Sequence, residues 1–105
     1  MAKYVFAYSG GRGMPEGEEA QQALMAAWGQ WFGQMGPAVV DGGNPFGPSK
    51  SVAPGGKVSD GGKTGLGGYS IVNADSLDAA AEMAKGCPVL SNGGTVDVYE
   101  TFDVM

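Results

Sequence analysis

The chain has 105 residues, a net charge of −5, no histidine and one cysteine. This length allows one domain with one core, and its few scattered basic side chains exclude nucleic acid as a direct partner, because that class of protein needs a basic footprint. Without histidine or a cysteine cluster there is no ligand set for zinc, and we expect no cofactor and no metal.

The first predicted element is a strand over KYVFAY, residues 3–8, which is rich in aromatic and β-branched residues. Its apolar run is too short for a secretory leader or a membrane span, so we expect a cytoplasmic protein without a membrane partner. Both alternating faces of the strand are largely apolar. We therefore expect the strand to be covered on two sides, with Phe6 at a subunit interface.

A long helix is predicted from Pro15 to about Met35. Proline is tolerated in a first helical turn, and the carboxylates of Glu16, Glu18 and Glu19 favour the positive end of the helix dipole. Large apolar residues then recur at helical spacing: Leu24, Trp28, Trp31, Phe32 and Met35. Gly36 and Pro37 end the helix.

A glycine-rich segment follows the short extended stretch 38–40. A small hairpin is predicted within it, with arms at 49–53 and 57–60 around the turn Pro54-Gly55-Gly56. The string GGKTG (61–65) resembles the end of a P-loop, but Lys57 stands where the first glycine of that motif belongs, and a strand follows instead of a helix. We expect no ATP or GTP binding through Lys63.

The second half of the chain repeats the strand–helix–strand order. GYSIVNA (68–74) is a predicted strand, and Asp75 or Ser76 caps a helix over 77–85. The apolar face of this helix is formed by Leu77, Ala80, Ala81 and Ala84. Residues 95–102 are the last predicted strand.

The order of elements predicts an α+β fold, a ferredoxin-like βαββαβ sandwich with an inserted glycine-rich hairpin. Two helices would cover one face of a four-stranded antiparallel sheet. The other face is also apolar, so we expect a second copy of the chain to cover it, which makes the protein a homodimer. Residues 1–105 are interpreted as a single domain.

Several blocks of the chain resemble the YCII-related proteins of the DGPF type. The most specific are the W-x-x-W helix (Trp28, Trp31), the V-x-D-G step at 58–61 and the run LGGYSIVNADSLDAAAEMAKGCPVL at 66–90. The resemblance implies a dimeric α+β barrel of ferredoxin-like subunits. Some relatives resemble muconolactone isomerase in fold and have a histidine with an acidic partner, proposed as an active-site pair. This chain has no histidine, which argues against that chemistry.

Three residues are candidates for a ligand cleft between the first helix, the sheet and the glycine-rich segment: Tyr8, Trp28 and Asp41. Aromatic side chains at strand or helix spacing more often form core or interface contacts. Asp41 is a weak catalytic candidate as a base at a strand end, but a carboxylate before two glycines more often caps a turn. Cys87, just after a helix C-terminus, is interpreted as structural.

Three functions remain open. The favoured one is a non-catalytic homodimer that binds a small, mostly apolar molecule or serves as an accessory or regulatory module. The alternative is an isomerase-like or lyase-like enzyme that uses Asp41 with a tyrosine hydroxyl. The third is a pure interaction protein, because DGPF-type genes often accompany regulatory genes of the sigma-factor type, and this role predicts a barrel without a cavity.

Overall fold

The protein forms one antiparallel sheet with helices and a separate hairpin, described here from a computed structural model that covers residues 2–11, 15–61 and 65–104. In chain order the elements are β1 (Ala2–Gly10), α1 (Glu18–Met35), the 3-10 turn η1 (Gly36–Ala38), β2 (Val39–Asp41), β3 (Lys50–Val52), β4 (Val58–Asp60), β5 (Leu66–Ala74), α2 (Leu77–Ala84), α3 (Pro88–Ser91) and β6 (Gly94–Glu100). Both predicted strand–helix–strand halves are present. The fold is mixed α+β, as the sequence predicts.

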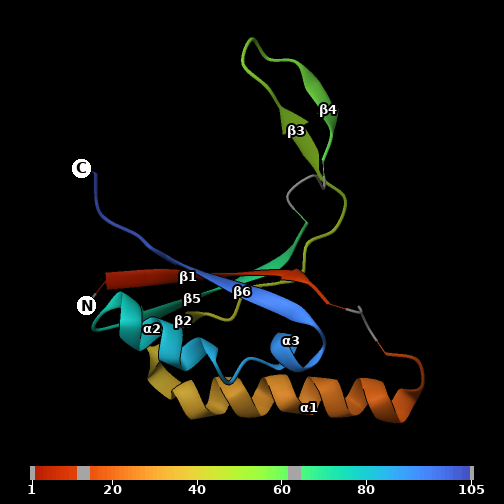
Figure 1. Cartoon of the computed structure of the whole chain (residues 1–105), viewed down its shortest axis with the longest axis vertical. Coiled ribbons are helices and arrows are strands. Elements are labelled where there is room, and N and C mark those ends of the chain that lie inside the picture. Colours follow the sequence, from red (N-terminus) through yellow and green to blue (C-terminus); the bar gives the residue numbers. More distant parts are fainter. Residues whose placement is uncertain (1, 12–14, 62–64, 105) are drawn as a thin grey trace.

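Four strands form the main sheet in the order β2-β5-β1-β6, and every neighbouring pair is antiparallel. All three helices lie on one side of this sheet (Figure 1). The opposite side, which we call the open face, has no helix on it. The hairpin of β3 and β4 projects from the body on the side of the open face (Figure 1).

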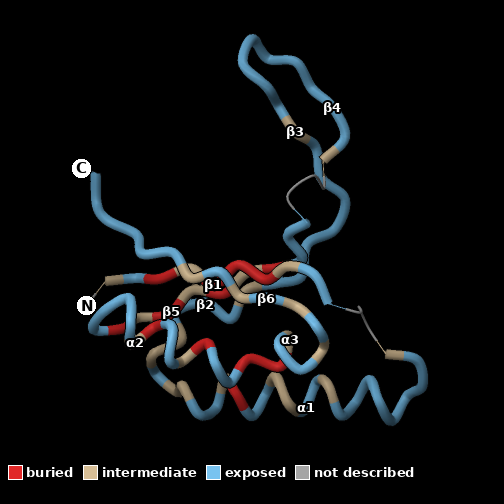
Figure 2. The backbone as a smooth tube through the Cα atoms, in the orientation of Figure 1, coloured by how far each residue is buried: buried red, intermediate tan, exposed pale blue. Residues whose placement is uncertain are grey.

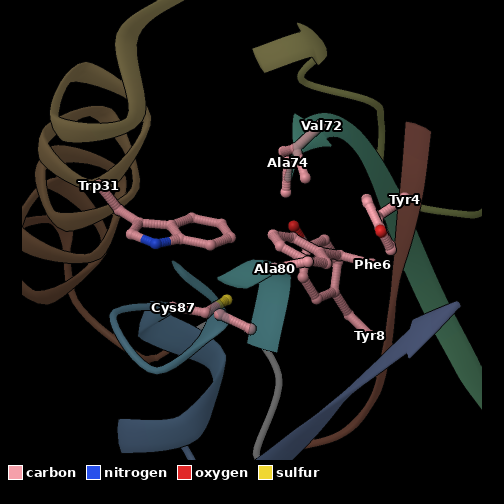
Figure 3. Packing of buried hydrophobic residues seen from close by; sticks show 9 residues of the cluster. Tyr4, Phe6, Tyr8, Trp31, Val72, Ala74, Ala80 and Cys87 are labelled. Carbon is pink, nitrogen blue, oxygen red and sulfur yellow. The ribbon is translucent and has the colours of Figure 1, made fainter. Parts of the chain in front are cut away.

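The core lies between the sheet and the helices. Tyr4, Phe6 and Tyr8 alternate along β1, and all three are buried toward the helices. Phe6 stacks on Trp31 of α1 with ring centroids 5.8 Å apart, and Figure 3 shows both side chains in one cluster with Cys87. The prediction that Phe6 lies at a subunit interface is therefore wrong, because the aromatic face of β1 is the one that the helices cover.

Helix α1 begins later than predicted, at Glu18, with Gly17 at φ 91° as the residue before it. Pro15 and Glu16 precede the helix, whereas Glu18 and Glu19 occupy the first turn as expected. The C-terminal prediction is confirmed, because Gly36 follows Met35 with a φ of 55°, a backbone conformation that glycine adopts without steric cost.

Helix α2 begins as predicted, with the Ser76 hydroxyl accepting a hydrogen bond from the Ala79 N–H at 3.0 Å. Its buried residues are Ala80 and Ala84. Leu77 and Ala81, also predicted on this face, are exposed instead. The helix is eight residues long and lies on the sheet along a narrow stripe, so positions on either side of that stripe remain in solvent.

Two short elements were not predicted, η1 and α3. Both contain a proline in their first turn, Pro37 and Pro88, and the sequence pattern indicates Pro37 only as the end of the preceding helix. A proline ring fixes φ near the helical value, so the same residue that ends one helix can begin another turn.

Strand β6 also ends earlier than predicted, at Glu100.

The predicted hairpin is present as β3 and β4. Its register pairs Lys50 with Asp60 and Val52 with Val58, and nearly all of it is exposed (Figure 2). The GGKTG string follows it. Gly62, Lys63 and Thr64, the end of the P-loop-like string, lie outside the described residues.

Candidate ligand-binding cleft

A cleft of about 520 Å³ lies between α1, the loop after β2 and the adjoining ends of β1 and β5. Helix α1 contributes Met25, Trp28 and Phe32, which are spaced three and four residues apart and therefore share one side of the helix. The sheet side is formed by Tyr8 together with residues 67–69, and the loop side by residues 42–45. This size and mostly apolar lining are typical of small-molecule sites.

Two of the three predicted cleft residues meet in this cleft. The Tyr8 and Trp28 rings contact each other edge to face, with centroids 5.1 Å apart and an interplanar angle of 78°. Phe32 continues the wall, its centroid 5.8 Å from that of Trp28. Edge-to-face pairs at these distances are favourable because of the ring quadrupoles. The rings of Tyr8, Trp28 and Phe32 therefore hold one another in place, and we call them the aromatic wall.

A buried hydroxyl chain holds the cleft together. The Tyr8 hydroxyl donates to Ser70 Oγ at 2.7 Å, and the Ser70 hydroxyl donates to the Gly42 carbonyl oxygen at 2.7 Å. Ser70 has no exposed surface. This serine connects β1, β5 and the loop after β2, so it positions two sides of the cleft relative to each other.

The sequence prediction missed Ser70, although the signal is visible in hindsight. Ser70 lies on β5 in the alternation Gly68, Ser70, Val72, Ala74, the positions that face the helices. A single hydroxyl in an apolar strand face must find a partner. The partner is a tyrosine on the neighbouring strand, and only the register of the two strands brings them together.

Tyr8 is a hydrogen-bond donor and not a base. Burial raises the pKa of its phenol well above the ordinary value, although the hydrogen bond to Ser70 acts in the opposite direction. The phenol therefore stays protonated throughout the neutral range. Its role in the cleft is structural and apolar, through its ring and through the bond to Ser70.

Asp41 is exposed at the end of β2 and is not among the residues that line the cleft. One carboxylate oxygen, Oδ1, accepts a hydrogen bond from the Gly43 N–H at 2.8 Å, the pattern of an Asx turn. The other, Oδ2, accepts a hydrogen bond from the Tyr69 hydroxyl at 3.3 Å. The carboxylate thus fixes the loop that forms one side of the cleft.

The loop after β2 lies against β5 with no space for a side chain at Gly43. This residue has a φ of 76°, and a Cβ built on it would overlap the carbonyl oxygen of Tyr69. Pro45 pairs with Gly68 of β5, and the Phe46 N–H donates to the Gly67 carbonyl at 2.9 Å. Gly43 in the loop and Gly68 in β5 permit this close approach, and both line the cleft.

Cys87 lies in the core and not in the cleft. Its side chain is buried, and burial raises the pKa of the thiol to about 11, although a backbone hydrogen bond from Val89 lowers it in part. Such a thiol is protonated and unreactive at neutral pH. Within the described ranges, no group of three or more Cys, Asp and Glu side chains could hold a metal ion.

None of the helices that the structure describes is long and apolar enough to span a bilayer.

The family of the chain follows from a comparison with known protein families. Residues 10–104 match the YCII-related domain. A search of curated proteins finds no match. The match includes every element from the end of β1 to beyond β6 and all the residues that line the cleft except Tyr8 and Ser9. The chain belongs to the YCII-related family.

Proposed function

We propose that this YCII-related chain is a non-catalytic small-molecule-binding subunit, with an accessory or regulatory role in which the ligand is sensed or carried. The observation that supports this most is the cleft of about 520 Å³ beside the aromatic wall. A pure interaction protein has no need of such a cavity, and sites of this size bury most of the surface of a small ligand. A cytoplasmic location and the DGPF branch of the family belong to the same proposal.

A proton-transfer function is less well supported. No residue lining the cleft within the described ranges carries a carboxylate, an amine or a thiol, and the chain contains no histidine. General acid–base catalysis needs a group that can exchange a proton near the operating pH. The lining therefore favours binding over turnover.

The open face supports a homodimer of ferredoxin-like subunits that pair into an α+β barrel. The order β2-β5-β1-β6 with all helices on one side is the arrangement expected for such a subunit. Val5 pairs with both Ile71 and Tyr99, so these apolar side chains form a row across three strands on the face that no helix covers. A second copy would remove the row from water.

Sedimentation equilibrium at micromolar concentration tests the homodimer. We expect twice the chain mass for the parent protein and the monomer mass for Val5→Asp, because the new carboxylate would be buried without a partner. Leu77→Asp is the matched control: Leu77 is 44 % exposed on α2, and its replacement should leave the dimer intact. A monomeric parent would contradict the proposed pairing.

Ligand-observed NMR with a fragment library tests the binding function. Fragments that bind the parent should lose at least about tenfold in affinity on Trp28→Ala, whereas Leu90→Ala, an exposed apolar position outside the cleft, should change nothing. Each variant is first checked for an unchanged melting temperature. If no fragment binds saturably, or if Trp28→Ala binds fragments as the parent does, the cleft is not the site.

A second candidate function, an isomerase-like or lyase-like activity, is supported by one contact. The Tyr69 hydroxyl donates to Asp41 Oδ2 at 3.3 Å, and Tyr69 lines the cleft. The Asp41 carboxylate therefore contacts a lining residue, although it does not line the cleft itself. In this alternative, Asp41→Asn abolishes turnover of a small lactone or enol substrate and leaves ligand affinity unchanged. In the favoured function there is no turnover to lose.

A further inference from the structure

The described lining of the cleft carries no formal charge. Among the residues that the structure describes as its lining, not one carries a carboxylate or a lysine or arginine side chain. The whole chain carries eleven acidic and six basic residues, and none of those that the structure describes lines the cleft. A charged ligand would lose its hydration there without gaining a counter-charge.

Most polar groups around the cleft are already used within the protein. The Tyr8 hydroxyl donates to Ser70, the Gly42 carbonyl accepts from Ser70, and the Gly43 N–H donates to Asp41. The side chains of Ser9 and Asn44, which both line the cleft, make no hydrogen bond to any described residue, and of the two Asn44 is the exposed one. Its amide can both donate and accept, so it can bind one polar group of a ligand.

The apolar part of the lining has a shape of its own. Trp28 contacts Tyr8 on one side and Phe32 on the other, and Met25, 67 % exposed, lies next to them on the same side of α1. Fixed rings prefer offset or edge contacts with another ring, and methionine adapts to its edge. Such a wall suits a flat ring system.

We infer that the cleft binds an uncharged, planar, mostly apolar molecule with one hydrogen-bonding group, which Asn44 recognises. This inference rests on the proposed binding function and specifies its ligand class. A cation could be attracted by the aromatic rings. However, these rings contact one another, and the carboxylate of Asp41, beside the lining residue Tyr69, is engaged by Gly43 and Tyr69 and does not line the cleft.

Isothermal titration at pH 7 with three probes of the same ring tests the ligand class: 2-naphthol, which is neutral, 2-naphthoate, which is an anion, and 2-naphthylmethylammonium, which is a cation. We expect 2-naphthol to bind at least about tenfold more tightly than either ion. Equal or tighter binding of an ion would overturn the neutral-ligand inference and leave the binding function standing. If none of the three binds up to millimolar concentration, the binding function itself is wrong.

A charge introduced at Met25 sharpens this test without affecting the core. Met25→Lys should raise the affinity for 2-naphthoate relative to that for 2-naphthol by about twofold to fivefold, with Met25→Gln as the neutral control. Asn44→Ala should lower 2-naphthol affinity and have no effect on naphthalene, which has no polar group. If Asn44→Ala affects both molecules equally, Asn44 is not the polar contact.

Discussion

The two faces of the sheet are built from the same strands but have different environments. On the helix-covered face, Tyr4, Phe6, Tyr8 and Val72 are almost completely buried. On the open face, Val5, Tyr69 and Ile71 are only half-buried, and Tyr99 is 58 % exposed. Strand residues alternate between faces, so the sequence of one strand specifies both environments. The side chains of the helix-covered face form the core of the subunit, whereas those of the open face remain available for contact with a partner.

The contrast also explains how the cleft is positioned. The helix-covered face supplies Tyr8, whose ring forms part of the aromatic wall and whose hydroxyl binds Ser70. The open face supplies Tyr69, which stacks on Phe46 at 5.8 Å and binds Asp41. The loop between β2 and Phe46 is therefore held from both faces of β5, and the cleft lies at the end of the sheet where these two sets of contacts meet.

The largest expected difference between the faces is in stability. Phe6→Ala should lower the free energy of unfolding by about 3–5 kcal/mol, because it removes a completely buried ring that stacks on Trp31. Val5→Ala, at the preceding residue of the same strand, removes a smaller side chain that is only half-buried in the subunit and should cost less than Phe6→Ala, even where a second copy covers it. Urea unfolding at one fixed protein concentration measures both. Equal losses would mean that the open face is as well packed as the other.

The buried hydroxyl chain should give an intermediate effect. Ser70→Ala leaves the Tyr8 hydroxyl and the Gly42 carbonyl without their partner and should cost about 1–3 kcal/mol. Tyr8→Phe removes only one donor, and Ser70 can still bind Gly42, so its cost should be smaller. Reversal of this order in thermal unfolding would show that Ser70 does not connect the two sides.

The core thiol predicts a pH dependence confined to alkaline conditions. The pKa of Cys87 is about 11 in the folded protein and 9.0 for an unperturbed thiol. The protonated thiol therefore contributes stability fully below pH 9, and this contribution is lost as the pH rises through about 11. Iodoacetamide at pH 8 should alkylate the folded protein at least about tenfold more slowly than the urea-unfolded chain. Equal rates would mean that Cys87 is accessible.

The smallest expected effect is at Asp41. Asp41→Asn retains a side-chain oxygen that can accept from Gly43, so it should cost at most about 1 kcal/mol. The affinity for 2-naphthol should not change, because this residue does not line the cleft. Asp41→Ala serves as the comparison, since it removes the cap as well. A loss of binding in Asp41→Asn would favour the carboxylate as a functional group.

Much of the fold could be predicted from the sequence because the signals are local. The alternation in β1, the helical spacing of Trp28, Trp31 and Phe32, and the serine cap of α2 each involve neighbouring residues. The helix-covered face could not be assigned to the aromatic side of β1, because both faces of that strand are apolar. The faces are distinguished only by where α1 packs.

The site was predictable to a smaller extent. Tyr8 and Trp28 were expected near a cleft, and the structure brings their rings into contact. Ser70 was missed because its partners, Tyr8 and Gly42, are 62 and 28 residues away in the chain. Such contacts depend on strand register, which hydrophobic patterns specify by face but not by partner. The role that we propose for Asn44 likewise rests on the surroundings of the cleft and not on a sequence pattern.

The most direct test of small-molecule binding in the cleft is a ¹⁵N-HSQC titration with 2-naphthol. We expect saturable shifts at the Trp28 indole N–H and at the amides of Gly43, Gly67 and Gly68, which line the cleft, and none at Val5 or Tyr99 on the open face. Shifts confined to the open face, or no saturable shift at millimolar 2-naphthol, would contradict the assignment of the cleft as the binding site.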